Sequence, residues 1–110
     1  MIIDYSKIDE ETLLNFKGGI GELETRNFVD AKNKIMMSRL KPGASSGFHV
    51  HEQNSEIVYI FKGHGHFVYD DTTESFKDGD VHYCPMGHGH AMYNDGEEDV
   101  EYLAIVPEHH

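Results

Sequence analysis

The stretch His49-Val50-His51-Glu52-Gln53-Asn54-Ser55-Glu56, HVHEQNSE in one-letter code, decides how the rest of the chain is interpreted. In a β-strand alternate side chains point to the same face, so His49 and His51 stand on one face, roughly 6.6 Å apart along the strand. Two imidazoles placed in this way can converge on one point. The pair therefore predicts a metal-binding or catalytic centre on that face.

Glu56 follows His51 by an odd number of residues, which would put it on the opposite face of one flat strand. The residues between them, 52–55, are polar and turn-prone, so we expect a loop that resets the register. Glu56 then begins a new strand, 56–61. Both faces of that strand are apolar, which predicts that it is buried on both sides.

A fourth ligand must come from elsewhere, and His90 is the candidate because it begins a strand after the turn-forming residues 85–89. Three neutral imidazoles and one carboxylate suit divalent manganese, iron, nickel, cobalt or zinc. Calcium and magnesium prefer mostly oxygen ligands. The predicted cofactor is therefore one divalent transition metal ion, held by His49, His51, Glu56 and His90.

These four residues lie within two longer patterns. The first comprises Gly43, His49, His51, Glu56 and Gly63, and the second comprises Gly79, Pro85, Gly87, His90 and Asn94. In order and spacing the two patterns, which span about half of the chain, resemble the motifs of the cupin family. The resemblance implies an all-β fold, a double-stranded β-helix or jelly-roll cupin barrel, with the four metal ligands pointing into the barrel.

The chain after residue 21 contains short apolar stretches separated by turn residues, a pattern typical of a sandwich or small barrel. The expected strands are 22–28, 34–40, 47–51, 56–61, 65–69, 73–76, 80–84, 91–94 and 100–106. Before them we expect a short helix over about 8–18, capped by Asp9 and ended by Gly18 and Gly19. The prediction is one cupin domain over 1–110, with its metal-binding barrel core at 34–106.

Twenty acidic residues against nine basic ones give a net charge of −11, which disfavours nucleic acid and anionic membranes as partners. No apolar run approaches the roughly 20 residues of a membrane-spanning helix, and the first residues do not resemble a signal peptide. The single cysteine, Cys84, cannot form an internal disulfide. We therefore expect a cytoplasmic protein whose partner is a small molecule.

Three further residues are candidates for the site. His88 is predicted either to shuttle protons at the barrel mouth, since imidazole titrates near neutral pH, or to be a solvated loop residue. Met92 shares a strand face with His90 and is expected to floor the pocket. Arg39, on the face of Ile35 and Met37, is a candidate clamp for an anionic substrate. The other histidines are interpreted as structural, with no role assigned to His109 and His110.

A metal with four protein ligands keeps open positions for adjacent oxygens of a substrate. The leading hypothesis is an enzyme that performs isomerase or lyase chemistry on a small sugar-derived or keto-acid metabolite. A metal-dependent dioxygenase and a non-catalytic small-molecule sensor are the alternatives, because the cupins that this chain resembles include all three. A homodimer is also expected, with Ile57, Tyr59 and Phe61 in its interface.

Overall fold

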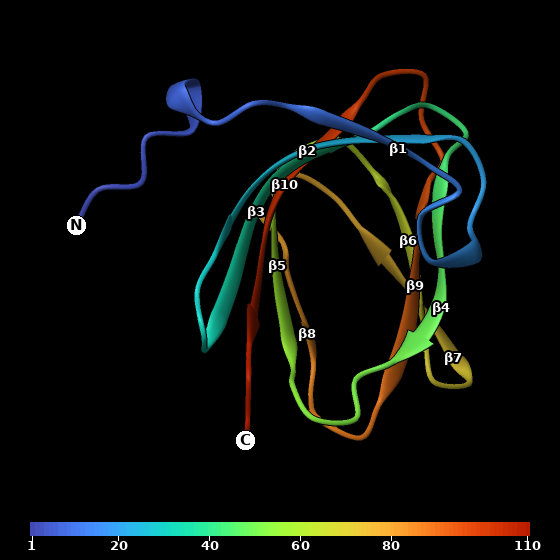
Figure 1. Ribbon diagram of the computed structural model, residues 1–110. Helices are drawn as coiled ribbons and strands as arrows, with labels where there is room; N and C mark the ends of the chain where they lie inside the picture. The colour runs from blue at the N-terminus through green and yellow to red at the C-terminus, as the bar shows by residue number, and fades with distance from the viewer.

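The computed structural model describes residues 1–110 as two antiparallel sheets that face each other (Figure 1). The six-stranded sheet has the order β1 (Glu11–Leu14), β2 (Glu22–Val29), β3 (Asn33–Leu40), β10 (Val100–Pro107), β5 (Glu56–Lys62) and β8 (Val81–Cys84). The four-stranded sheet has the order β4 (Ser45–Val50), β9 (Gly89–Asn94), β6 (Gly65–Tyr69) and β7 (Thr72–Phe76). The predicted all-β jelly-roll architecture is confirmed.

The nine strands expected from the sequence are all present, with ends that differ by no more than two residues. The loop predicted between His51 and Glu56 is present as well: β4 ends at Val50, β5 begins at Glu56, and Asn54 forms an isolated bridge with Glu108. Because of this loop, Glu56, an even-numbered residue, faces the same interior as the odd-numbered His49 and His51.

The predicted helix over 8–18 is wrong. Residues 11–14 form β1, which pairs with β2 and places Leu13 opposite Leu23. The only helical structure is two three-residue 3-10 turns, η1 (Tyr5–Lys7) and η2 (Phe16–Gly18), and neither approaches a membrane-spanning helix. A helix this short is marginal by itself, whereas the open edge of β2 offers unpaired backbone groups to a passing strand. Tertiary pairing therefore overrides the local helix signals.

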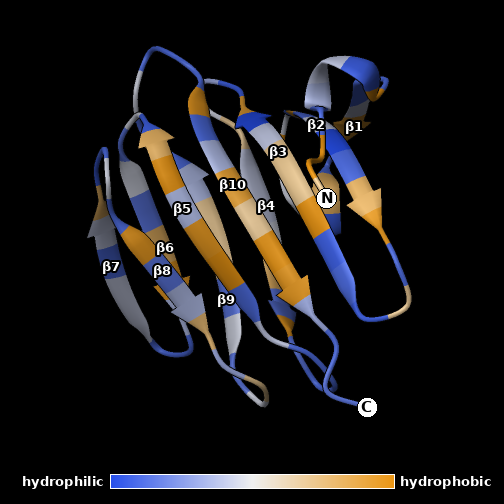
Figure 2. Ribbon diagram, turned by 90° about the vertical axis from the view of Figure 1, so that its left-hand side faces the viewer, coloured by the Kyte–Doolittle hydropathy of each residue, from blue (hydrophilic) through white to orange (hydrophobic).

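The core lies between the inner faces of the two sheets and includes Val58 and Ile60 of β5, Phe67 of β6 and Val100 of β10. On the outer face of β5 the side chains Ile57, Tyr59 and Phe61 are 36%, 40% and 43% exposed. Figure 2 shows this outer face, with apolar segments on β3, β10, β5 and β8. The prediction that both faces of the strand are buried is therefore wrong for the single chain.

Candidate metal centre

The four predicted ligands meet in the interior. His49 lies on β4, His51 directly follows that strand, Glu56 begins β5, and His90 lies on β9. Pairing of β4 with β9 places His49 opposite His90, after an irregularity in register that begins at Ser46. One ligand atom from each of the four lies within 4.8 Å of the others.

The carboxylate of Glu56 is the centre of this group. Its Oε1 lies 2.9 Å from Nε2 of His90, 3.1 Å from Nε2 of His51 and 3.9 Å from Nε2 of His49. Glu56, His51 and His90 are buried, whereas the side chain of His49 is 19% exposed. The cluster is therefore closed on the inside and reached by solvent beside His49.

Two of the imidazoles are oriented by oxygen acceptors at Nδ1. His49 donates from Nδ1 to the carbonyl of Gly47 over 2.8 Å, and His51 donates to Oδ1 of Asn54 over 2.6 Å. The amide orientation of Asn54 is consistent, because its Nδ2 donates to Glu108. Each bond fixes the proton on Nδ1 and leaves a lone pair on Nε2, directed at the cluster.

The third imidazole is held by another histidine. Nε2 of His82 lies 3.0 Å from Nδ1 of His90, and Nδ1 of His82 lies 3.0 Å from Oε1 of Glu74. A neutral His82 that donates to Glu74 must accept at Nε2, so His90 donates from Nδ1 and keeps its own Nε2 lone pair. Burial and the neighbouring His90 lower the pKa of His82, against the opposing effect of Glu74, which favours this neutral form.

The resulting arrangement fits a metal cation. Lone pairs of three imidazole nitrogens and an oxygen of Glu56 converge, and such an assembly is repulsive unless positive charge lies among them. Burial alone would raise the pKa of Glu56, but the three imidazoles around its carboxylate outweigh burial and hold that pKa well below its usual range. Three nitrogens and one carboxylate are the donor set of divalent transition metals.

His51 shows how the surroundings act on one ligand. Burial lowers its pKa, but the contacts of its two ring nitrogens with the oxygens of Glu56 and Asn54 outweigh burial, and the net shift of the pKa is upward. The positive charge of Lys17 opposes the rise. Lys17 and His51 line the same cavity.

Residues that support the ligands were not found from the sequence. His82 was interpreted as structural, yet it supports His90 while its ring stacks on Phe67 with 3.7 Å between centroids. The alternation of β8, with His82 and Cys84 inward, is the signal that could have indicated it. Asn54 was interpreted only as a turn residue. It is not one of the motif residues, so nothing in the sequence pattern indicated its contact with His51.

The structure does not bring His88 to the cluster. Its Nδ1 lies 2.6 Å from Oδ2 of Asp70, its side chain is 44% exposed, and its ring lies beside Tyr69. Only its main-chain carbonyl reaches toward the ligands, where it accepts from the amide of His51. Of the two alternatives for His88, the geometry matches the solvated loop residue. Met92, in contrast, is buried and lines a cavity beside the ligands.

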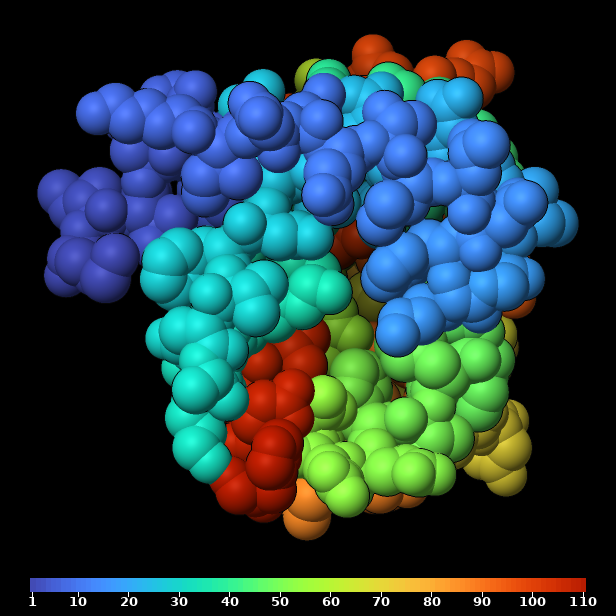
Figure 3. Space-filling model, in the orientation of Figure 1, coloured from blue at the N-terminus to red at the C-terminus, as the bar shows by residue number.

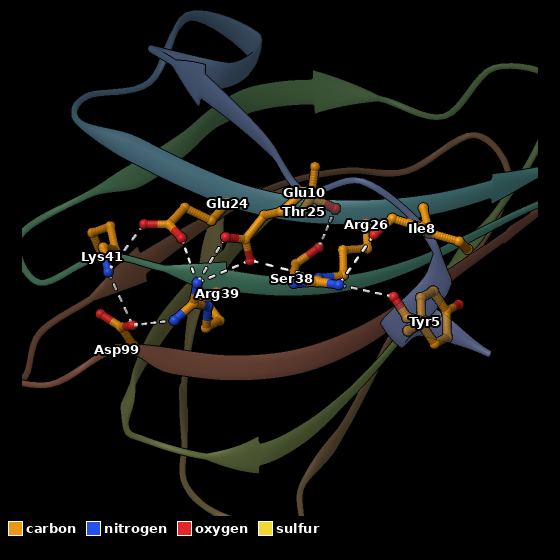
Figure 4. A network of polar contacts seen from close by, with 10 residues as sticks. All are labelled: Tyr5, Ile8, Glu10, Glu24, Thr25, Arg26, Ser38, Arg39, Lys41 and Asp99. Carbon is orange, nitrogen blue, oxygen red and sulfur yellow. Dashed lines mark hydrogen bonds and ion pairs between the residues drawn. The ribbon is translucent and has the colours of Figure 1, made fainter.

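Arg39 lies outside the barrel as well. Figure 4 shows its guanidinium between the carboxylates of Glu10, Glu24 and Asp99, and this group of ion pairs also includes Lys41. The inner face of β3 carries the buried residues of even number, so the face shared by Ile35, Met37 and Arg39 points outward. Arg39, the expected substrate clamp, is thus not positioned to contact a substrate bound at the four-residue cluster.

Two cavities adjoin the centre. The larger, which we call the mouth pocket, has a volume of about 490 Å³ and is lined by residues of η2, β3, the segment 49–54 and the end of β10. Figure 3 shows the hollow between the blue η2 region, the cyan β3, the green segment and the red chain end. The smaller, of about 30 Å³, lies inside and is lined by Met92, Tyr102 and three of the ligands. Such a volume is suited to a water-sized ligand.

Comparison with known proteins identifies the family, since the family model described as Cupin domain matches residues 36–106. The chain is a cupin. This cupin is 35% identical to an oxalate-binding protein of Thermotoga maritima, over 96% of the chain and 93% of that protein. A crystal structure of a predicted oxalate decarboxylase from Thermotoga maritima superposes with a TM-score of 0.91 at 33% identity, covering 98% of this cupin and 99% of that chain.

The cupin fold is shared more widely. A polyketide cyclase from Streptomyces resistomycificus superposes with a TM-score of 0.78 at 21% identity, covering 97% of this cupin and 78% of that chain. At this identity the likeness concerns the fold alone. Both matches from Thermotoga maritima, in contrast, extend over nearly the whole length of this cupin.

Proposed function

We propose that this cupin holds one divalent transition metal ion at His49, His51, Glu56 and His90 and uses it to bind a small carboxylate, with oxalate as the leading candidate. The observation that carries the proposal is the set of three imidazoles, each held at Nδ1 so that Nε2 faces the carboxylate of Glu56. The similarity to an oxalate-binding protein supports the choice of ligand.

The bound ion would supply a positive centre with open positions for two adjacent oxygens of a carboxylate. His49, the partly exposed ligand, faces the mouth pocket, so the open side is the side from which a solute arrives. Phe16, Val106 and Met36 give that pocket an apolar wall. Its volume of about 490 Å³ falls within the range of small-molecule sites.

The test is calorimetric titration of oxalate into protein loaded with manganese, cobalt or zinc, and into the metal-free protein. We expect saturable binding at one site per chain only in the loaded protein. The double variant His51→Ala, Glu56→Ala should bind neither metal nor oxalate. Oxalate binding by the metal-free protein or by the double variant that is as tight as binding by the loaded wild type would refute the proposal.

Lyase chemistry is a second candidate, in agreement with the isomerase or lyase hypothesis for a sugar-derived or keto-acid metabolite. Tyr102 lines the inner cavity beside Glu56, and burial, followed by the charge of Glu56, raises its pKa, so it holds its proton at neutral pH. The similarity to a predicted oxalate decarboxylase supports the same direction. Formate release from oxalate would establish it, oxygen uptake would favour a dioxygenase, and binding without turnover would favour a sensor.

A homodimer completes the proposal. The outer face of β5 exposes Ile57, Tyr59 and Phe61, and neighbouring β8 exposes Val81 and Tyr83. A contiguous apolar face of this kind on a soluble domain is typical of an interface. Light scattering should give twice the mass of the chain, and Phe61→Glu should lower it to one chain. A wild-type mass of one chain at micromolar concentration would contradict the dimer.

A further inference from the structure

The basic residues of this acidic chain are distributed unevenly. Lys and Arg residues number nine, and five of them form ion pairs: Arg26, Arg39, Lys41, Lys62 and Lys77. Lys32 contacts the main-chain carbonyl of His110. Lys7, Lys17 and Lys34 form no ion pair, and the last two line the mouth pocket. In a chain with a net charge of −11, two amines without ion pairs thus line the pocket at the opening of the metal centre.

Lys34 belongs to the inner face of β3. It shares that face with Met36 and Ser38, which are 9% and 3% exposed. The buried face of the strand therefore ends in an amine at the open end of the barrel, where Lys34 pairs in register with Val106 of β10. A partly buried amine in this position is stabilised by an anion that enters the pocket.

Lys17 is held over the opposite side of the pocket. Its backbone is left-handed, with φ of 55°, inside a loop that is pressed onto β4. A Cβ at Gly47 would lie 2.0 Å from the carbonyl oxygen of Lys17, and the amide of Ser45 donates to Ile20 over 2.8 Å. The strand that carries His49 therefore also fixes the backbone of Lys17, and the amine of Lys17 lies 5.7 Å from the centroid of the Phe16 ring, which lines the same pocket.

We propose that Lys17 and Lys34 form a second anion-binding point at the mouth of the metal centre, which makes the ligand a small dicarboxylate. One carboxylate lies at the four-residue cluster and the second is held by the two amines. The rim also carries Glu52 and Glu108, and the carboxylate of Glu108 is already engaged by Asn54 and His110. The inference rests on the proposed function, and it names the feature that selects among carboxylates.

The experiment compares oxalate with glycolate, a chelator of similar size with one carboxylate fewer. Calorimetric titrations use manganese-loaded wild type, Lys17→Met, Lys34→Met and the double variant, with Lys7→Met as the matched control because Lys7 also lacks an ion pair but lies on η1. We expect each pocket substitution to weaken oxalate binding about tenfold, as for one charge-assisted hydrogen bond. Glycolate and manganese affinity should change little.

The salt dependence gives a second readout. Oxalate affinity should fall with ionic strength in the wild type and less steeply in the double variant, because two charges have been removed. A preference for oxalate over glycolate that survives in the double variant would overturn the inference and leave the proposed function standing. Failure of the loaded wild type to bind either acid would overturn both.

Discussion

Nε2 of His82 lies 3.0 Å from Nδ1 of the metal-centre residue His90, and Nδ1 of His82 lies 3.0 Å from the carboxylate of Glu74. The side chain of His82 is only 5% exposed, whereas that of Glu74 is 49% exposed. A carboxylate at the surface thus orients a buried ligand through one intermediate imidazole. This arrangement fixes both the tautomer and the ring plane of His90.

Substitution His82→Phe tests this support. Phenylalanine retains the stacking on Phe67 but cannot accept a hydrogen bond from His90. We expect metal affinity to fall about 10- to 100-fold with the fold intact, measured by competition with a coloured chelator. His66→Phe is the matched control. His66 also stacks on an aromatic ring, that of Tyr93, and also contacts a carboxylate, that of Asp95, but it lies away from the centre. Equal affinities of the His82 variant and the wild type would contradict the role.

Metal binding should stabilise the folded chain, because the four ligands are assembled only in the native state. At a free metal concentration 100 times Kd the gain is about 2.7 kcal/mol, which corresponds to a rise in Tm of about 10 °C. Calorimetric melting with metal and after chelation measures it. Glu56→Gln removes the central charge and should abolish most of the rise. An equal wild-type Tm with metal and after chelation would refute the metal site.

The pH dependence of stability should include a contribution from Glu10. Its hydrogen bond with Arg39 lowers its pKa below the ordinary 4.5. The stabilisation by this carboxylate is therefore complete above the ordinary value and is lost as the pH falls through the lower, folded-state pKa. Glu10→Gln should cost less than about 1 kcal/mol at pH 7, and the difference from wild type should vanish on acidification. Urea unfolding measures the cost of the substitution and its pH dependence, with Glu97→Gln as the control at a carboxylate without an ion pair. A stability difference between Glu10→Gln and wild type that stays constant at all pH values would contradict the role of Glu10.

Cys84 should be inert in the native protein. It is fully buried, and burial raises the pKa of its thiol to about 12. Since the thiolate is the reactive form, a disulfide reagent at pH 8 should modify Cys84 only as fast as the chain unfolds. The same reagent in concentrated urea should react at once and serves as the control. Rapid modification without denaturant would show that the thiol is accessible.

The strands and the ligand set could be predicted from the sequence because both depend on short-range patterns: the alternation of side chains along a strand and the positions of turn residues. His49 and His51 lie two positions apart at the end of a strand, and the turn-prone stretch before Glu56 indicates the loop. The failures have nonlocal causes. The segment that was expected to be a helix became β1 because the edge of β2 was available, and no residue within 8–18 reveals that edge.

Arg39 shows the same limit in another form. Both faces of β3 contain apolar residues, so alternation defines two faces without identifying the inner one. Pairing of β3 with β10 and β2 turns Arg39 outward and Lys34 inward. The contacts of His82 and Asn54 with the ligands likewise depend on segments that only the fold brings together.

The four ligands come from both sheets, since Glu56 belongs to the six-stranded sheet while His49 and His90 belong to the four-stranded one. An ion seated among them is a cross-link between the two layers, and the layers cannot separate while all four bonds hold. Because the layers cannot part before the ion leaves, deuterium uptake by the amides of β5 and β9 should be slower in the metal-loaded protein than after chelation.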